Sequence, residues 1–374
     1  MHQKHPRLLH PTLGRYARAE FSFVGTTCAR MDGLMETLRA ALPDFRVLTV
    51  IGDHGAPRDP AFFQVGSKQF TGGPVRWNDY DDRLAGRRAD LALVNGNHYP
   101  AARQIVFVDP NKAGTLERRR EQLTDVAAIV MCPGATDLPD FLEGARPRAV
   151  PELAERVRCT LEEAGEALLP LLSTAATDAI PTVKALILAG GKSSRMGTDK
   201  GQLKYRTDQT ELQRMVALTQ GLGLETYLSL AADAVAPPVD VTSVIRDRFL
   251  GMGPLGAISS AFLTEPDTAW LVLACDLPLL DAGTVADLLA AREVRRVATA
   301  IRIAEQPFPE PLAALYEPRA YPRLLEFLSL GYACPRKMLI NSDVAHHVLA
   351  DGTPLTNANT PEQRAAVLAA LGEA

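Results

Sequence analysis

Short apolar runs alternate with longer amphipathic segments along most of the chain. Each run is rich in valine, isoleucine, leucine or alanine and is bounded by glycine, proline or polar residues. Such runs are too short for typical helices and indicate buried strands, whereas the segments between them carry apolar residues at helical spacing. This alternation predicts an α/β protein with parallel sheets. The predicted strands lie at 21–24, in the first part of 47–59, and at 89–95, 103–110, 125–133, 183–188, 225–231, 242–247, 270–275, 297–303 and 311–318.

The length of the chain and one weakly patterned segment indicate two domains. The chain has 374 residues, more than one domain usually needs. Residues 136–172 carry leucine, alanine and glutamate at helical spacing and are predicted to close the first domain. Residues 173–181 (STAATDAIP) are small, polar and end in proline, which is typical of a linker. We therefore expect domains at 1–172 and 182–374.

Composition and charge exclude several classes of protein. With 47% hydrophobic and 22% charged residues the chain is an ordinary globular protein, and its net charge of −4 gives no support to binding of nucleic acid or a membrane surface. No apolar run is long enough to span a bilayer, and the N-terminus lacks a signal peptide's apolar core. The cysteines are scattered, odd in number and never in CxxC spacing, which argues against disulfides or zinc. We therefore expect a cytoplasmic protein.

The segment 183–200 (VKALILAGGKSSRMGTDK) carries the strongest chemical signal. A buried strand runs directly into Gly190 and Gly191, where backbone N–H groups can approach an anion because no Cβ stands in the way. Arg195 and Lys200 follow and supply the positive charge that a polyphosphate needs. A glycine turn with a solvated basic face is the simpler alternative. The combination of strand, glycine pair, arginine and lysine favours a nucleoside triphosphate site.

LAGGKSSRMGTDK resembles the signature of nucleotidyltransferases with a Rossmann-like fold, and it is most similar to molybdenum cofactor guanylyltransferases. The resemblance implies a Rossmann-like sheet in the C-terminal domain. It also implies that Lys200, helped by Arg195, offsets charge on the phosphates as a catalytic residue. The main chain of four residues would hold the base and phosphates: Leu188, Ala189, Gly190 and Gly191.

A second element, WLVLACDLPLL (270–280), places an acidic residue at a strand end. Asp276 follows the buried run, and Pro278 forces a turn. Mg²⁺ is usually held by one or two carboxylates together with substrate phosphates. Alone, this aspartate could simply cap the predicted helix 281–293. Together with the glycine-rich segment it predicts that Asp276 binds Mg²⁺ and takes part in catalysis.

Two further residues are assigned to the nucleotide. Asp247 ends the strand 242–247, and the family uses an aspartate there for GTP, although a turn or helix cap explains it equally well. Ser229 matches a small polar residue that the family places near the nucleotide.

The segment GMGPLG (251–256) also fits the dinucleotide-binding pattern G-x-G-x-x-G. However, it begins too far from the end of the strand 242–247, and Pro254 is better placed to start a helix. An NAD-dependent enzyme is therefore disfavoured.

The acceptor side of the predicted site is formed by later segments. PLAALYEP (311–318) resembles the segment that lines the pterin side of the family's cleft, but Glu310 stands where many relatives have a histidine. Arg336 and Lys337 are both candidates to neutralise the terminal phosphate of molybdopterin, although exposed basic residues are often merely solvated. Of the two, Arg336 is assigned to the acceptor. In NANTPEQ a capping box accounts for the threonine and glutamine. Asn357 and Asn359 match the family's NxNTPE segment and are predicted to face the acceptor.

Residues 20–135 resemble the GTP-binding adaptor protein of molybdopterin guanine dinucleotide biosynthesis. GTTCARMD has the shape of a P-loop that begins at Gly25, but the second glycine, the lysine and the hydroxyl residue are replaced. Asn95 also stands where that family usually has an acidic residue. We therefore expect a degenerate P-loop-like α/β domain that serves as a scaffold and does not hydrolyse GTP. The replacing residues are Arg30, Met31 and Asp32, and no role is assigned to Asp53, His54, Asn97 and His98.

These assignments predict transfer of GMP from GTP to molybdopterin, which yields molybdopterin guanine dinucleotide and pyrophosphate. The implied partners are GTP, molybdopterin, molybdenum-insertion proteins and acceptor molybdoenzymes, without nucleic acid or membrane. Two alternatives stay open. One is the same fold with another nucleotide or acceptor, such as cytidylyl transfer to molybdopterin or transfer to a sugar phosphate. The other is a nucleotide-binding adaptor without turnover.

Overall fold

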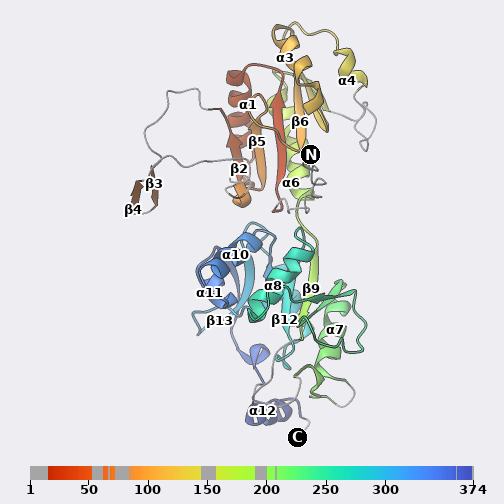
Figure 1. The fold of residues 1–374 in the computed structure, drawn as a ribbon, viewed down its shortest axis with the longest axis vertical. Helices are drawn as coiled ribbons and strands as arrows, with labels where there is room; N and C mark the ends of the chain where they lie inside the picture. Colours follow the sequence, from red (N-terminus) through yellow and green to blue (C-terminus); the bar gives the residue numbers. More distant parts are fainter. Residues whose placement is uncertain are drawn as a thin grey trace, which may run out of the picture. The chain divides into compact units, whose positions relative to one another are not determined.

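The computed structural model describes residues 16–52, 62–65, 68–71, 84, 86–144, 157–189, 200–206, 209–358 and 360–372. The chain divides into two compact units, Arg18–Ile180 and Pro181 onward (Figure 1). Tyr16 and Ala17 belong to the second unit, where Arg319 Nη2 donates to the Tyr16 carbonyl oxygen at 3.5 Å. Each unit has its own sheet. No helix in the described part of the chain is long and apolar enough to cross a membrane.

The first unit is built on a six-stranded sheet in the order β2-β5-β1-β6-β7-β8. All paired strands in it run parallel, as the sequence predicts. A separate hairpin pairs β3 with β4. The strands are β1 (Ala19–Val24), β2 (Val47–Val50), β3 (Phe62–Val65), β4 (Lys68–Thr71), β5 (Leu91–Asn95), β6 (Arg103–Val108), β7 (Val126–Met131) and β8 (Val157–Thr160).

Helices cover both faces of this sheet. One face carries Phe21 and Phe23, both fully buried, and packs against α1, α5 and α6. The opposite face carries Val106 and Val108 and packs against α3 and α4. Full burial of a phenylalanine contributes about 1.5–3 kcal/mol, so the first face holds much of this unit's core. The helices are α1 (Cys28–Ala41), η1 (Gly86–Arg88), η2 (Pro110–Lys112), α3 (Ala113–Arg118), η3 (Arg120–Gln122), α4 (Asp140–Gly144), α5 (Ala164–Ala167) and α6 (Leu169–Asp178).

The connection between β1 and α1 is too short to be a phosphate-binding loop. Helix α1 begins at Cys28, so only three residues follow the strand before the helix. Gly25 has φ +107°, and a Cβ there would lie 2.3 Å from the Phe107 carbonyl oxygen. Met31, at the position of the motif's lysine, is fully buried in the core. The predicted P-loop shape is therefore wrong, because these residues form the first turns of a helix.

A buried carboxylate lies beside this short connection. Asp109 accepts hydrogen bonds from Thr26 Oγ1 at 2.7 Å and Arg30 Nη1 at 2.9 Å. Burial alone would raise the pKa of Asp109, but hydrogen bonds from Thr26 and Asn111 and the charge of Arg30 hold it below its usual value. The Asp109 carboxylate is thus ionised and paired with Arg30. The expectation that the first unit does not hydrolyse GTP stays a prediction.

The second unit is built on a seven-stranded sheet in the order β11-β10-β9-β12-β14-β13-β15. Strand β14 runs antiparallel to both neighbours, and the other pairs are parallel. The α/β class is therefore as the sequence predicts, and β14 is the strand of this sheet that departs from the predicted parallel direction. The strands are β9 (Val183–Leu188), β10 (Thr226–Leu230), β11 (Ser243–Arg246), β12 (Ala269–Ala274), β13 (Ala298–Ile303), β14 (Ala313–Tyr316) and β15 (Val344–Leu349).

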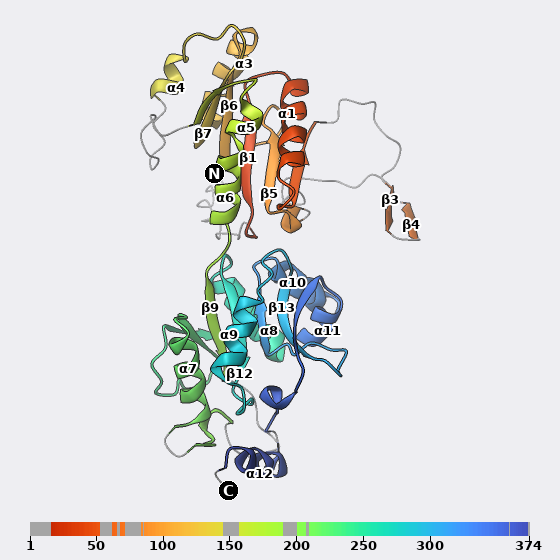
Figure 2. The ribbon, with the colours of Figure 1, turned by 180° about the vertical axis from the view of Figure 1, so that it is seen from behind.

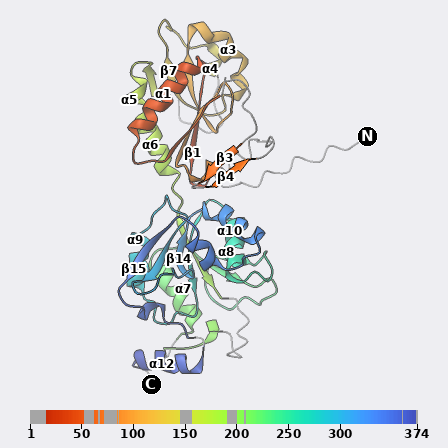
Figure 3. The same cartoon turned by 90° about the vertical axis from the view of Figure 1, so that its left-hand side faces the viewer.

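Both faces of the second sheet are covered, so its central strands are apolar throughout. Successive side chains of a strand point to opposite faces, and accordingly Leu186 packs with α8, α10 and α11 while Ile187 packs with α7 and α9. Figures 2 and 3 show α9 and α8 on opposite sides of this sheet. The helices are η5 (Lys200–Gln202), α7 (Glu211–Gly221), α8 (Gly253–Thr264), α9 (Ala282–Ala290), α10 (Ala320–Ser329), α11 (Pro335–Ile340), η6 (Thr353–Leu355) and α12 (Pro361–Ala370).

Two predictions about the end of the first unit are wrong. Residues 173–178 belong to α6, where Ala176 is buried, because small residues at helical spacing pack closely against the core. The predicted linker therefore shrinks to the few residues around Ile180. The expected helical stretch 136–172 also contains β8, which pairs with β7 at the edge of the sheet. Parallel pairing with an existing sheet outweighs local helical preference at those residues.

A capping box starts α7, and its loss is expected to cost stability. Thr210 Oγ1 accepts from the Gln213 N–H, and the Gln213 side chain accepts from the Thr210 N–H at 2.9 Å. Replacing Thr210 by alanine should lower the free energy of unfolding of the second unit by about 1 kcal/mol. Urea denaturation, followed by Trp270 fluorescence in a Trp77→Phe background, measures this change. Thr210→Ser keeps the hydroxyl and should lose less than half as much.

Candidate functional site

The carboxyl ends of the parallel strands in the second unit meet at one edge of the sheet. Leu188, at the end of β9, pairs with Ser229 of β10 and with Ala274 of β12. Asp276 lies two residues beyond the end of β12, and Asp247 directly follows β11. Sheets of this kind bind ligands at this edge. The strand ends named by the sequence therefore lie where a ligand is expected.

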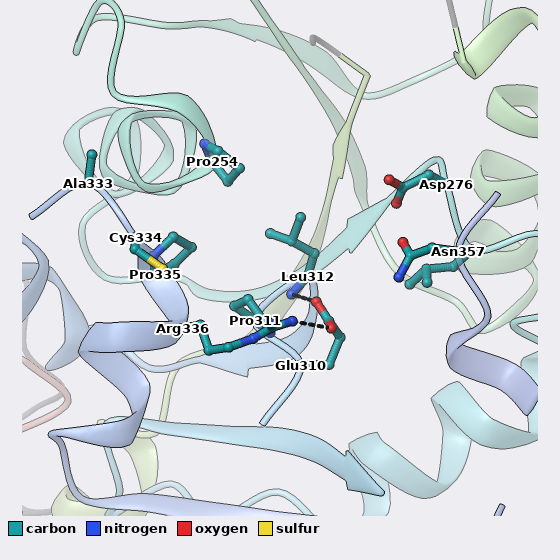
Figure 4. A pocket seen from close by; sticks show the side chains of 11 residues that line it. Pro254, Asp276, Glu310, Pro311, Leu312, Ala333, Cys334, Pro335, Arg336 and Asn357 are labelled. Atoms are coloured by element: carbon teal, nitrogen blue, oxygen red, sulfur yellow. Dashed lines mark hydrogen bonds and ion pairs between the residues drawn. The ribbon is translucent and has the colours of Figure 1, made fainter. Parts of the chain in front are cut away.

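A pocket of about 430 Å³ opens at this edge (Figure 4). That volume is within the usual range for small-molecule sites. Figure 4 shows Asp276 and Asn357 next to each other on one side of the pocket, with Glu310 and Arg336 on another. The pocket thus brings together three of the predicted site residues from distant parts of the sequence. Its lining includes Pro254, Asp276, Glu310, Cys334, Arg336 and Asn357.

Arg336 is held at the pocket by an ion pair that the sequence did not predict. Its Nη2 donates to Glu310 Oε2 at 2.8 Å, and Glu310 Oε1 accepts from the Leu312 N–H at 3.3 Å. Arg336 is about half exposed, so the pair contributes little to stability. In the sequence, Glu310 stands out only because many relatives have a histidine at that position. In the structure it places the Arg336 guanidinium at the pocket edge.

The turn that carries Asp276 is fixed by a buried arginine. Arg214 donates to the carbonyl oxygens of Leu277 at 3.0 Å and Leu280 at 2.6 Å. Its charge is balanced by Glu211, which is 1% exposed and accepts from Arg214 Nε at 2.9 Å. Burial raises the pKa of Glu211, and Arg214 opposes this shift. The spacing of Glu211 and Arg214 along a helix suggests a pair, but nothing in the sequence indicates the turn that they hold.

Three separate segments are tied together beside Asp276. Leu203, Tyr205 and Ala358 share a buried cluster with α12. The Ala358 N–H donates to the Asp276 carbonyl oxygen at 3.3 Å, and Arg206 Nη1 donates to the Pro278 carbonyl oxygen at 3.2 Å. The main chain at Lys200 begins η5, at the start of the first of these segments. The Lys200 backbone thus lies three residues before Leu203, which belongs to this cluster, and its side chain is outside the described part of the structure.

Four of the predicted nucleotide residues that the structure describes do not line this pocket: Leu188, Ala189, Ser229 and Asp247. Asp247 Oδ1 accepts from the Phe249 N–H at 3.0 Å and from Ser260 Oγ at 3.1 Å, which is the turn role left open by the sequence. Ser229 is 4% exposed, and its carbonyl oxygen accepts from the Ala189 N–H at 3.2 Å. Leu188 and Ala189 are partly buried at the end of β9. Four further predicted residues lie outside the described residues: Gly190, Gly191, Arg195 and Asn359.

GMGPLG forms the start of α8, as the sequence predicts. Pro254 lies in the first turn of this helix. Gly251, in the turn before the helix, and Gly253, its first residue, have φ +76° and +56°, values that glycine adopts without strain. The segment is therefore a helix start and not a dinucleotide-binding loop.

Asp276 fits a metal ion that is held mainly by the substrate. No group of three or more His, Cys, Asp or Glu side chains with metal-binding spacing exists among the described residues. Glu310, the other carboxylate lining the pocket, is already paired with Arg336. Mg²⁺ commonly uses one or two carboxylates and completes its shell with phosphates and water. Two carboxylates line the pocket, Asp276 and Glu310, so the residues present there fit that mode.

Comparisons with known proteins assign the second unit to a family. A model of the MobA-like NTP transferase domain matches residues 185–346. The "Molybdenum cofactor biosynthesis bifunctional protein" of Synechocystis sp. is 32% identical over 178 residues, 47% of this chain and 51% of that protein. A "Probable molybdenum cofactor guanylyltransferase" of Opitutus terrae is 34% identical over 133 residues, 35% of this chain and 64% of that protein.

The first of these relatives is thus matched over about half its length and the second over less than two thirds. A third match is more complete. The "Probable molybdenum cofactor guanylyltransferase" of Carboxydothermus hydrogenoformans is 32% identical over 182 residues, which cover 47% of this chain and 89% of that protein. With this near-complete match and the domain match at 185–346, the chain belongs to the MobA-like molybdenum cofactor guanylyltransferase family.

Proposed function

We propose that the second unit transfers GMP from GTP to molybdopterin and releases pyrophosphate. The observation that carries this proposal is the pocket at the sheet edge, where Asp276 and Asn357 lie opposite Arg336. An acidic anchor, an amide and a guanidinium around one cavity suit a substrate with phosphates and a polar ring. The names of the relatives supply the identity of the nucleotide and the acceptor.

The nucleotide is expected to lie between the end of β9 and Asp276. The main chain beyond Leu188 would hold the base and phosphates, and Lys200 with Arg195 would offset the phosphate charge. Asp276 would bind Mg²⁺, which stabilises negative charge on phosphate oxygens when it is present. Asn357, Asn359 and Arg336 would contact the acceptor. The other nucleotide-binding residues of the proposal are Ala189, Gly190, Gly191, Ser229 and Asp247.

The reaction exchanges one phosphoanhydride bond for another. A phosphate oxygen of the acceptor forms a bond to the α-phosphorus of GTP, and the bond from this phosphorus to the bridging oxygen of pyrophosphate breaks. Positioning and charge neutralisation carry most of such a reaction. Arg336 would orient the attacking phosphate, and the turn that Arg214 fixes would keep Asp276 in place.

A product assay tests this function directly. The purified chain is incubated with Mg²⁺, molybdopterin and either GTP, CTP or ATP, and the products are identified by mass spectrometry. We expect molybdopterin guanine dinucleotide with GTP and at least tenfold less product with the other nucleotides. Product with CTP alone would show cytidylyl transfer. Binding of GTP without pyrophosphate release under any condition would support a non-catalytic adaptor instead.

Replacing Arg336 by glutamine is expected to raise KM for molybdopterin about tenfold and to leave KM for GTP within twofold. The loss of one charge-assisted hydrogen bond to a phosphate accounts for a change of this size. Lys337→Gln is the matched control, because Lys337 is a neighbouring exposed cation whose Nζ lies 3.6 Å from the ring centroid of Tyr332. Equal effects of both substitutions, or a change confined to GTP, would contradict the assignment of Arg336 to the acceptor.

We also propose that the first unit is a docking or scaffold domain. The short connection after β1 supports this proposal, because α1 begins at Cys28, before a loop long enough to surround a phosphate is complete. We therefore expect the purified chain to transfer GMP to molybdopterin without hydrolysing GTP.

A further inference from the structure

The first unit carries a thiol–imidazole pair that the proposed reaction does not use. Cys28 Sγ lies 3.4 Å from His98 Nε2, although the two residues are seventy positions apart in sequence. Cys28 is the first residue of α1, and His98 follows the end of β5. Strand β5 pairs with β1 in parallel, so both side chains lie at the carboxyl edge of this sheet. The fold therefore brings a nucleophile next to a base.

An amide completes the cluster. Asn97 Nδ2 lies 3.8 Å from Cys28 Sγ and is oriented by a hydrogen bond to the Thr26 carbonyl oxygen at 2.9 Å. Asn97 Oδ1 is buried and accepts no hydrogen bond from any described residue. Arg119 Nη2 fixes the Asn97 main chain by donating to its carbonyl oxygen at 2.6 Å. Cys28 is therefore held between an imidazole and a positioned N–H donor.

Two further features of Cys28 are its place at a helix start and its exposure. Helix α1 has 14 residues, and its N-terminal N–H groups point toward the first turn, where Cys28 lies. The N-cap residue Thr27 makes no side-chain cap hydrogen bond there. Cys28 is also partly exposed, so that a small reagent can reach it. A thiol near a base and a helix N-terminus is a typical reactive cysteine.

The other cysteines of the chain lack this combination. Cys132 and Cys159 are buried, and burial raises the pKa of both thiols. Cys275 is buried as well. Cys334 is exposed and precedes a helix, but no described histidine is recorded as a hydrogen-bond partner of its thiol. Cys334 therefore serves as an internal control with greater exposure.

We infer that Cys28 is a nucleophilic modification site for low-molecular-weight disulfides, with His98 as its base. The Cys28 sulfur forms a bond to one sulfur of the disulfide, and the bond between the two sulfurs of the reagent breaks. The Cys28 proton passes to His98 Nε2 and then to the departing thiolate. The products are a mixed disulfide on Cys28 and one free thiol, so that the cysteine is oxidised and the departing sulfur is reduced.

Oxidised glutathione is a suitable probe of this site. The full-length chain is incubated with it at pH 7, and the fraction of each cysteine modified over time is measured by peptide mass spectrometry. We expect Cys28 to react at least tenfold faster than Cys334, although Cys334 is more exposed. His98→Ala should lower the modification rate of Cys28 at least tenfold and leave the rate of Cys334 within twofold of the parent value. Asn97→Ala should lower the modification rate of Cys28 by a smaller factor.

Two results would overturn the inference. The first is a rate for Cys28 in the unaltered chain that does not exceed the rate for Cys334, which needs no variant and is independent of any folding defect. The second is an unchanged Cys28 rate in His98→Ala with a circular dichroism spectrum that matches the parent. Neither result bears on nucleotidyl transfer, because the thiol and the pocket at Asp276 belong to different units.

Discussion

Replacing Asp276 by asparagine is expected to lower kcat/KM for nucleotidyl transfer by at least about 100-fold, equivalent to about 2.7 kcal/mol of transition-state stabilisation. Asparagine keeps the size of the side chain but removes the negative charge that would hold Mg²⁺. The Ala358 N–H bonds to the main-chain carbonyl of Asp276, so this contact survives the substitution. Initial rates of pyrophosphate release, measured over a range of GTP concentrations at saturating molybdopterin, give kcat/KM for the variant and the parent. Raising Mg²⁺ should recover part of the lost activity.

Asp287→Asn is the matched control for this experiment. Asp287 is an exposed aspartate of α9, and it does not line the pocket. Its replacement should leave kcat/KM within twofold of the parent. An Asp276→Asn chain with more than a third of the parent activity and an unchanged Mg²⁺ requirement would remove Asp276 from the catalytic site. That outcome would not contradict the proposed function itself, which the product assay with the parent chain tests separately.

Replacing Arg214 by methionine is expected to lower the free energy of unfolding of the second unit by about 3–5 kcal/mol at pH 7. Methionine fills a similar volume but leaves Glu211 buried without its cation and the Leu277 and Leu280 carbonyl oxygens without their donor. Urea denaturation followed by Trp270 fluorescence in the Trp77→Phe background measures the loss. Activity should fall as well, since the turn after Asp276 loses its support.

The loss caused by Arg214→Met is expected to depend on pH. The pKa of Glu211 is raised in the folded chain by burial, and Arg214 opposes this shift, so removing Arg214 raises it further. The folded variant then binds a proton more tightly than the unfolded chain, and its stability falls as pH rises above the unfolded pKa of about 4.3. The destabilisation should therefore be small near pH 4 and largest at neutral pH.

The double variant Glu211→Leu with Arg214→Met is the control for this interpretation. It removes both buried charges and should recover more than half of the stability lost by Arg214→Met alone. It should also lose the additional pH dependence. A single variant that is equally destabilised at pH 4 and pH 7 would show that packing, and not the buried charge, dominates at this site.

The parts of the fold that depend on local pattern could be predicted from the sequence. The runs around β9 and β12 are apolar on both faces because helices cover both sides of the sheet, and they were identified as buried strands. Asp276 at the end of β12 and Pro254 in the first turn of α8 followed from strand ends and proline geometry. These features need only the residues near them in sequence.

The parts that depend on distant contacts could not be predicted. Helix α6 extends through residues 173–178, which the sequence predicts to be a linker. It does so because Ala176 packs into the core of the first unit, and the local sequence does not indicate that contact. Strand β8 forms because its backbone can pair with β7 at the edge of the sheet. The hydrogen bond from Arg214 to the Leu277 carbonyl oxygen, in the turn near Asp276, joins residues more than sixty positions apart in the sequence. The pairing of Glu310 with Arg336 likewise depends on where α11 packs.

The reversed direction of β14 separates two kinds of connection at the sheet edge. Leu273 of β12 pairs with Ala313 of β14, so the end of one strand lies beside the beginning of the other. Asp276 therefore follows a strand, whereas Glu310 precedes one. Insertions or substitutions in 304–310 can therefore alter the side of the pocket that carries Glu310 without moving the end of β12 that precedes Asp276. In the proposed function, such changes would alter selectivity for the acceptor and leave the nucleotide-binding residues in place.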